Sequence, residues 1–129
     1  MRAEARHNIE FLWGWLDALR RRDTATMAAA LHAEVVWQGI RPELACNGPD
    51  DVVETYVSGY ADNQKIEAIE VLGGESHVVV GVRGPDMGKV NDIEIGSELY
   101  NVFTIEEGKI ARIEDYLRRD EALAAAGLD

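Results

Sequence analysis

Hydrophobic residues between positions 4 and 21 recur at steps of three and four, which is the spacing of one helix face. The stripe consists of Phe11, Leu12, Trp15, Leu16 and Leu19. Arginines at positions 20–22 follow the stripe, and a helix C-terminus favours cations. We predict a helix over residues 4–21 whose apolar stripe faces the core.

Two further helical stretches follow, with a strand between them. In "DTATMAAALH", Asp23 or Thr24 can cap a second helix that ends at His32. "EVVWQG" is rich in β-branched and aromatic residues and predicts a short strand. After a loop, Pro49 and the two acids beside it predict the start of a third helix. The buried stripe of this helix is expected to consist of Val52, Val53, Tyr56, Val57 and Tyr60.

Later in the chain the hydrophobic period shortens to the alternation that is typical of strands. "KIEAIEVLGG" and "SHVVVGVRG" predict a hairpin that turns at Gly73 and Gly74. "GPDMGKVND" predicts a longer loop. "IEIGSELYNVFTIEEGKIARIEDY" predicts two more strands, over residues 93–105 and 109–116, with a turn at "EEGK". "LRRDEALAAAG" predicts a short helix that ends at Gly127.

This order of elements predicts an α+β fold in a single domain over residues 1–129. Three helices and one strand precede a four-strand meander, and one short helix closes the chain. A strongly curved, mostly antiparallel sheet wrapped around the three N-terminal helices would form a cone. Such a cone is expected to leave a mostly apolar pocket of the size of a small ligand.

Alternation along the last two strands predicts which side chains face this pocket. The inward face is expected to carry Leu99, Asn101 and Phe103 on one strand and Ala111, Ile113 and Asp115 on the next. The opposite face would then carry Glu98, Tyr100 and Val102 on one strand and Ile110, Arg112, Glu114 and Tyr116 on the next. Trp37, in line with Val35 on the first strand, is also expected to point inward.

Asp115 is the unusual residue of this pattern, because it is an acid on an apolar face. A carboxylate beside an apolar wall loses hydration, and its pKa rises. A raised pKa is what a general acid or base needs at neutral pH. The spacing leaves a structural role equally open: Asp115 ends a strand, and it can cap the helix that follows or pair with an arginine.

Composition narrows the classes of function. The net charge of −11 opposes binding to nucleic acid or to an anionic membrane surface. Three scattered histidines and a single cysteine, Cys46, offer neither a disulfide nor a metal-ligand spacing. No phosphate-cradling or dinucleotide glycine motif is present, so we expect neither a metal nor a cofactor. Without a signal-peptide pattern or a membrane-length apolar run, a cytoplasmic location is expected.

Three stretches of the chain resemble a known family: "ALHAEVVWQG", "NGPDDVVETY" and "VFTIEEGKIARIEDYLRRDEALAAAGL". They are similar to the nuclear transport factor 2-like superfamily, and within it to the SnoaL-like small-molecule branch. The resemblance covers nearly the whole chain. It implies a cone-shaped α+β barrel with a deep pocket, and a homodimer packed through the sheet. Glu98 and Tyr100, on the outer sheet face, are the expected dimer contacts.

Three enzyme types on this fold imply different partners for Asp115. In the limonene-epoxide hydrolase pattern, Asp115 and Arg83 match, but Pro85 replaces an aspartate, and Trp37 and Gly39 replace a tyrosine and an asparagine. The ketosteroid isomerase pattern needs a tyrosine on the first helix, and this helix has none. The SnoaL-like polyketide cyclase pattern uses a late-strand aspartate and a histidine. Asp115 could be that aspartate, and His77 is the candidate histidine, although a solvated turn residue is the simpler interpretation of its position.

The resemblance implies a protein that binds a small apolar molecule, polyketide-, terpene- or steroid-like, in its pocket. Asp115 would act as a cofactor-free acid/base catalyst, and Arg83 would hold or polarise Asp115 or a ligand oxygen. Asn101 would hydrogen-bond the substrate. The walls of the pocket would be formed by Trp37, Tyr56, Leu99, Phe103 and Ile113. The alternative is a non-catalytic small-molecule binder or a dimeric scaffold, and a protein-binding module is a third reading by fold analogy alone.

Overall fold

The computed structural model describes residues 3–40, 43–62, 68–84, 89–90, 93–94 and 98–128. Its helices are α1 (Ala3–Arg21), α2 (Thr24–Ala29), α3 (Pro49–Asp62) and α4 (Arg119–Ala126). Its strands are β1 (Leu31–Gln38), β2 (Ala45–Asn47), β3 (Ala68–Gly73), β4 (His77–Arg83), β5 (Lys89–Val90), β6 (Ile93–Glu94), β7 (Glu98–Glu106) and β8 (Lys109–Tyr116). No helix in these residues is long and apolar enough to cross a membrane.

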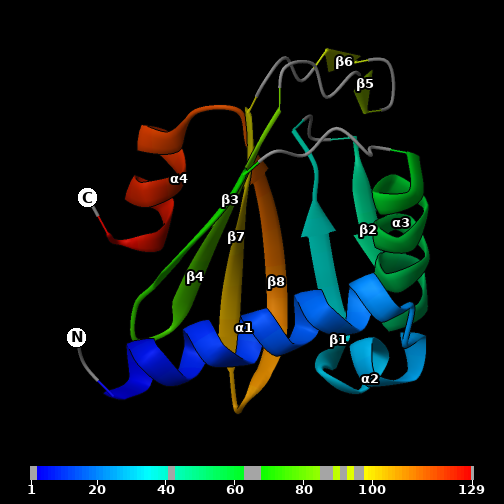
Figure 1. Ribbon diagram of the computed structural model, residues 1–129, viewed down its shortest axis with the longest axis horizontal. Helices are drawn as coiled ribbons and strands as arrows, with labels where there is room; N and C mark the ends of the chain where they lie inside the picture. Colours follow the sequence, from blue (N-terminus) through cyan, green and yellow to red (C-terminus); the bar gives the residue numbers. More distant parts are fainter. Residues whose placement is uncertain are drawn as a thin grey trace.

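A six-stranded curved sheet in the order β2-β1-β8-β7-β4-β3 organises the molecule (Figure 1). Helices α1, α2 and α3 pack on one face of this sheet and α4 packs on the other. The expected α+β fold with a mostly antiparallel sheet is confirmed. The sheet is not a closed barrel, however, because β2 and β3 are its two edges.

Helix α1 is held against the sheet by the stripe that the sequence predicted. Leu12, Trp15 and Leu19 are buried in the main core. The amide of Asn8 donates to the carbonyl oxygens of Gly74 and Glu75, at 3.0 and 3.1 Å, and fastens the helix to the turn between β3 and β4. These contacts fix the first turns of α1 over the closed end of that hairpin.

Helix α2 is shorter than the sequence predicted. Asp23 caps it, accepting a hydrogen bond from the backbone N–H of Thr26 at 3.2 Å, but the helix ends at Ala29. Leu31 and His32 belong to β1, so the prediction that His32 ends a helix was wrong. The reason is tertiary: Nε2 of His32 lies 2.9 Å from the carbonyl oxygen of Glu106, at the end of β7.

Strand β1 pairs with β2 on one side, antiparallel, and with β8 on the other, parallel. The sequence predicted only a loop where β2 lies, because three residues are too few for a period. The parallel pairing with β8 joins segments far apart in the chain and sets Trp37 beside Ile113. This register brings Trp37 to the end of the sheet where Asp115 lies.

The predicted hairpin of β3 and β4 is confirmed, and β7 and β8 form the second hairpin. The strand predicted over residues 93–105 is corrected: β7 begins at Glu98, while Ile93–Glu94 forms β6 and pairs with β5. Alternation continues through "IEIGSELYNVF", so the sequence pattern alone does not mark this boundary. Ile95, which alternation puts on the same face as Leu99, lies outside the described residues.

Both faces of β7 are buried, which corrects the predicted outer face. Tyr100 and Val102 were expected to point outward, but they are fully buried beneath α4 with Ala122. The expectation that Tyr100 makes a dimer contact was therefore wrong, since its side chain is covered by the chain's own helix. Alternation identified the two faces correctly but could not show that a helix covers the second one.

Strand β8 departs from simple alternation at its start. Its register with β7 shifts between Thr104 and Ile105, which is the signature of a bulge. As a result Ile110 and Ile113 are both fully buried in the main core. The prediction that Ile110 points away from the core was wrong for this reason, while Asp115 kept its predicted face.

Candidate functional site

Asp115 lies near the end of β8, directly opposite Asn101 on β7. The amide Nδ2 of Asn101 donates to Oδ1 of Asp115 at 2.5 Å. The indole Nε1 of Trp37, on β1, donates to the same oxygen at 2.7 Å. Three neighbouring strands therefore place two N–H donors on one oxygen of one carboxyl group.

Tyr56, on α3, contacts this group from the face of the sheet that α1, α2 and α3 cover. Its hydroxyl donates to Oδ1 of Asn101 at 2.9 Å. Its ring stacks on that of Trp37, with centroids 4.3 Å apart and planes 25° apart. Trp15 meets the Tyr56 ring edge-on at 5.0 Å, and Phe103 lies 6.4 Å from it. Aromatic rings from α1, α3, β1 and β7 thus pack together beside the polar groups at Asp115.

Loss of hydration on burial raises the pKa of Asp115 to about 7. The hydrogen bonds from Trp37 and Asn101 favour the charged form and oppose this rise, but burial is the larger effect. The carboxyl group is accordingly close to half protonated at neutral pH. This is the condition in which one group can both give and take a proton.

The second oxygen of Asp115, Oδ2, receives no hydrogen bond from the described part of the chain. Every fully buried side-chain oxygen and nitrogen among the described residues does have a hydrogen-bond partner. Oδ2 is therefore not fully buried, and Asp115 as a whole is half-buried. A ligand that reaches this carboxyl group would meet Oδ2.

The other titratable groups near Asp115 are neutral. Burial raises the pKa of the Tyr56 hydroxyl well above its usual value, and the charge of Asp115 adds to this effect. Burial also raises the pKa of the Cys46 thiol. Cys46 lies 3.4 Å from the hydroxyl of Thr55 and is not activated as a nucleophile. No described cation shifts the pKa of Asp115, so hydration loss and two neutral donors govern it.

Arg83 does not join this group, and the expected pair with Asp115 is not formed. Val80 pairs with Asn101 and Val82 with Leu99, so alternation turns Arg83 to the opposite face of the sheet. There its guanidinium donates to the hydroxyl of Tyr100 at 3.3 Å. Tyr100 in turn donates a short hydrogen bond to Glu98. Arg83 therefore belongs to the α4 side of the molecule.

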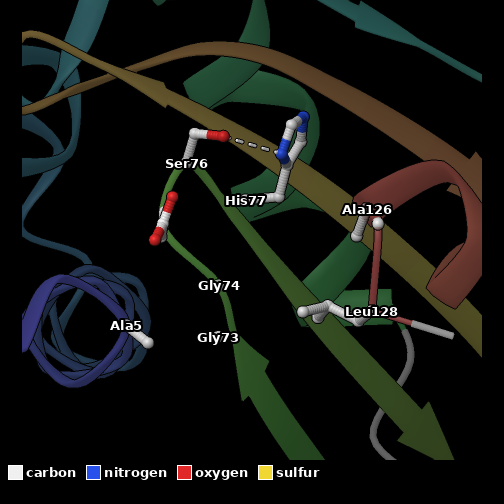
Figure 2. Close-up of a pocket in the computed structure, with 9 residues that line it drawn as sticks. Ala5, Gly73, Gly74, Ser76, His77, Ala126 and Leu128 are labelled. Carbon is white, nitrogen blue, oxygen red and sulfur yellow. Dashed lines mark hydrogen bonds between the residues drawn. The ribbon is translucent and has the colours of Figure 1, made fainter. Parts of the chain in front are cut away.

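His77 also lies apart from Asp115. It starts β4, pairs with Thr104 and shares the outer face with Arg83. Its Nδ1 lies 3.0 Å from the hydroxyl oxygen of Ser76. Figure 2 shows this pair in a hollow between α1, the β3–β4 turn and the end of α4. The hollow has a volume of about 510 Å³ and is lined by Gly74 and Leu128 among others. None of the residues predicted to form the ligand pocket lines it.

The predicted wall residues differ in how far they can meet a ligand. Phe103 and Ile113 are fully buried and pair with each other two residues along the strands from Asn101 and Asp115. Trp37, Tyr56 and Leu99 are half-buried. Two other hollows, of about 490 and 510 Å³, are lined by residues of α1 and the β7–β8 turn and by residues of α2 and α3. Neither includes Asp115, so a ligand cavity at Asp115 stays a prediction.

Sequence reasoning did not find the Trp37 indole as a partner of Asp115, or Trp15 as a support for Tyr56. Trp37 was expected only to form a wall, because 78 positions separate it from Asp115 in the sequence. Aromatic residues at helical spacing predict burial without naming a partner. Among the described residues, no three His, Cys, Asp or Glu side chains lie close enough to hold a metal ion.

The chain is similar to known proteins in both sequence and fold. The sequence pattern of the SnoaL-like domain matches residues 14–113. No curated protein matches the chain. A nuclear transport factor 2-like protein from Burkholderia xenovorans LB400 is 17% identical, with 95% of this chain and 96% of that chain covered and a TM-score of 0.64.

Two other solved structures carry functional descriptions. A proposed polyketide cyclase from Xanthomonas campestris pv. campestris is 16% identical, with 95% of this chain and 98% of that chain covered and a TM-score of 0.63. A proposed ketosteroid isomerase from Kribbella flavida DSM 17836 is 15% identical, with 87% and 78% covered and a TM-score of 0.61. At these identities the likeness shows the fold and leaves the reaction open.

Proposed function

Because the chain belongs to the SnoaL-like domain family, we propose that it binds a small, mostly apolar molecule at Asp115 and acts on it by acid/base catalysis. The ligand class is polyketide-, terpene- or steroid-like, and the reaction is a cyclisation, isomerisation or hydrolysis. No cofactor takes part. Asp115 is the group that exchanges a proton with the ligand.

The observation that carries this proposal is the asymmetric environment of the Asp115 carboxyl group. Oδ1 holds both N–H donors, while Oδ2 is not fully buried and is without a donor in the described structure. With a pKa of about 7, the group has both its forms populated near neutral pH. The aromatic rings of Trp37 and Tyr56 supply a flat apolar surface beside it, suited to a cyclic ligand.

The chemistry follows from these two oxygens. In the charged form, Oδ2 takes a proton from a carbon next to a carbonyl, or from an attacking hydroxyl or water. Oδ1 keeps its hydrogen bonds from Trp37 and Asn101, which stabilise the carboxylate left after the proton is given back. Aromatic side chains on the inner side limit access of bulk water. The descriptions of the Xanthomonas and Kribbella proteins name reactions of this kind, and they support the choice of ligand class.

Asp115→Asn tests the catalytic role. The change keeps the shape of the side chain and removes its proton exchange, so we expect turnover of a responsive cyclic ketone or polyketide analogue to fall by at least about 10²-fold. Wild-type kcat/KM should rise with pH around 7 if the charged form is the base. Glu114→Gln is the matched control, because it makes the same chemical change one residue away on the opposite face. Equal activity of wild type and Asp115→Asn would exclude Asp115 as the catalyst.

A non-catalytic small-molecule binder, or a dimeric scaffold, is the second candidate. The position of Arg83 favours this second candidate. Arg83 lies at Tyr100, and no other described charged side chain assists Asp115 as a second catalytic group. A binder would hold apolar ligands equally well before and after Asp115→Asn, without product in either case. Calorimetry and product analysis on the same two proteins separate the candidates, and sedimentation at several concentrations tests the dimer.

A further inference from the structure

We propose that Tyr56 is a positioning residue for Asp115: its hydroxyl fixes the orientation of the Asn101 amide and thereby keeps the exchangeable proton on Oδ2. The inference rests on the proposed function for its catalytic meaning, but its structural part stands on the hydrogen-bond network alone. In this role Tyr56 and Asn101 act on the Asp115 carboxyl group, whereas the sequence suggested that Asn101 would hydrogen-bond the substrate and that Tyr56 would form a wall.

The direction of each hydrogen bond carries this argument. The Tyr56 hydroxyl donates to the Asn101 carbonyl oxygen at 2.9 Å, which leaves only the Nδ2 side of the amide to face Asp115. That nitrogen is a donor and cannot accept a proton. The Trp37 indole is likewise a donor only, and both reach Oδ1. Oδ1 is therefore the acceptor of the carboxyl group, and a proton on Asp115 is directed to Oδ2.

A second arrangement of the same atoms shows what Tyr56 prevents. If the Asn101 amide rotated by half a turn, its oxygen would face Oδ1. Asp115 would then be protonated on Oδ1 and donate to Asn101, with the Trp37 N–H still accepted by that oxygen. The proton would be held in an internal hydrogen bond, away from Oδ2. In this arrangement the Asn101 nitrogen would face the Tyr56 hydroxyl oxygen, which can accept its hydrogen, but the hydroxyl hydrogen would lose the Asn101 oxygen as its acceptor. The Tyr56 hydroxyl therefore favours the first arrangement, in which it donates.

Burial of Asn101 makes the orientation of its amide important. Asn101 is only 8% exposed and is one of two buried polar residues in the described chain. Water cannot easily replace a lost partner there, so its amide must find partners within the protein. The Tyr56 ring is held independently of its hydroxyl, by stacking on Trp37 and by the edge-on contact with Trp15. The hydroxyl is thus free to serve the network and is not needed to keep the ring in place.

The other groups that face Asp115 carry no charge that would mask an effect of the Tyr56 hydroxyl. From β1 and β7 it meets the neutral Trp37 and Asn101, and from α3 the neutral Tyr56. Cys46, on β2, is the other titratable group close enough to sense its charge, and its thiol is protonated at neutral pH. No charged side chain in the described residues adds to the pKa of Asp115. Removal of the Tyr56 hydroxyl should therefore appear directly as a shift of the Asp115 pKa.

Tyr56→Phe tests the proposal by NMR titration of the Asp115 carboxyl carbon and of the Asn101 side-chain amide. We expect the Asp115 pKa to rise by about one unit, since a donor to Oδ1 is lost and an acceptor takes its place. The Asn101 amide protons should lose their response to the titration of Asp115. Tyr116→Phe is the matched control, because its hydroxyl bonds Glu114 at 3.4 Å, outside the network. It should leave both signals unchanged.

A double-variant cycle shows whether Tyr56 acts on the Asp115 pKa through Asn101 or directly. In an Asn101→Ala background, Tyr56→Phe should shift the Asp115 pKa no further. An unchanged Asp115 pKa in Tyr56→Phe alone, or an equal shift with and without Asn101, would overturn the proposal. The titration needs no substrate, so a failed screen for turnover would refute the proposed catalysis and leave this result standing. Where a substrate is found, Tyr56→Phe should lower kcat with little change in KM.

Discussion

At the scale of single residues, the Asp115 carboxyl group is set by opposing effects. Burial favours the neutral acid, whereas N–H donors from Trp37 and Asn101 favour the carboxylate. Burial is the larger effect, and a pKa of about 7 results. Removing any one donor should therefore shift the titration in a direction that is known in advance.

Trp37→Phe should raise the Asp115 pKa above 7. The change keeps an aromatic ring to stack on Tyr56 but removes the indole N–H that lies 2.7 Å from Oδ1. A hydrogen bond to a charged group contributes about 1.5–3 kcal/mol, which corresponds to about one to two pKa units. Carbon-detected NMR of Asp115 measures the shift.

Trp15→Phe is the control for that change. Its indole N–H donates to the carbonyl oxygen of Met27 at 3.2 Å and does not touch Asp115. We expect the Asp115 pKa to stay in place while the free energy of unfolding falls by about 1 kcal/mol. If both tryptophan variants moved the pKa equally, the shift would come from general loosening of the core and not from the hydrogen bond.

At the scale of elements, the contact between α1 and the β3–β4 hairpin depends on a missing side chain. A Cβ atom on Gly73 would lie 2.5 Å from Cγ1 of Ile9 and 2.8 Å from the carbonyl oxygen of Ala5. The second of these atoms is backbone, so the helix itself would have to move. Gly73 was predicted as a turn residue, and its larger role is to let α1 approach the sheet.

Gly73→Ala should lower the free energy of unfolding by about 1–3 kcal/mol, the usual cost of overpacking. Gly14→Ala, in the middle of α1, is the matched control, since the added Cβ would meet no atom within 4 Å. It should stabilise the protein by about 0.5–1 kcal/mol through helix propensity. Urea unfolding of both variants measures the difference, and a neutral Gly73→Ala would contradict the close helix approach.

At the scale of the whole molecule, Asp115 links the proposed site to stability. The folded state raises the pKa of Asp115 to about 7 from its usual value of 3.8, so between these two pH values the folded chain binds more protons than the unfolded chain. Stability from this group is therefore highest at acidic pH, falls as the pH rises from about 4 to about 7, and stays low above that. The difference of about three pKa units corresponds to as much as about 4 kcal/mol.

Comparison of wild type with Asp115→Asn isolates this contribution. Asp17, Asp23 and Glu70 have lowered pKa values and lose stability at the acidic end, but they are present in both proteins. We expect Asp115→Asn to be more stable than wild type at pH 8 and to lose that advantage near pH 5. Urea unfolding at the two values measures this. A constant difference between the proteins would mean that Asp115 titrates normally in the folded state.

Local patterns predicted the elements whose signals lie within a short stretch of chain. The stripe of α1, the cap of α2 (predicted at Asp23 or Thr24) and the hairpin turns at Gly73 and "EEGK" depend on neighbours in the sequence. Asp115 was found in the same way, because an acid on an apolar strand face is visible without a partner. The three-residue strand β2, the bulge between Ile110 and Arg112 and the boundary of β7 were not predictable, since each depends on a pairing register with another strand.

The sequence by itself determined the α+β class, the family resemblance and the unusual position of Asp115. The tertiary structure decided which partners that carboxyl group has. It turned Arg83 to the opposite face, brought Trp37 from β1 and Tyr56 from α3, and covered Tyr100 with α4. The physical reason is that alternation fixes the face of a side chain within its own strand. Which residue it meets depends on parallel pairing and helix packing between segments far apart in the chain.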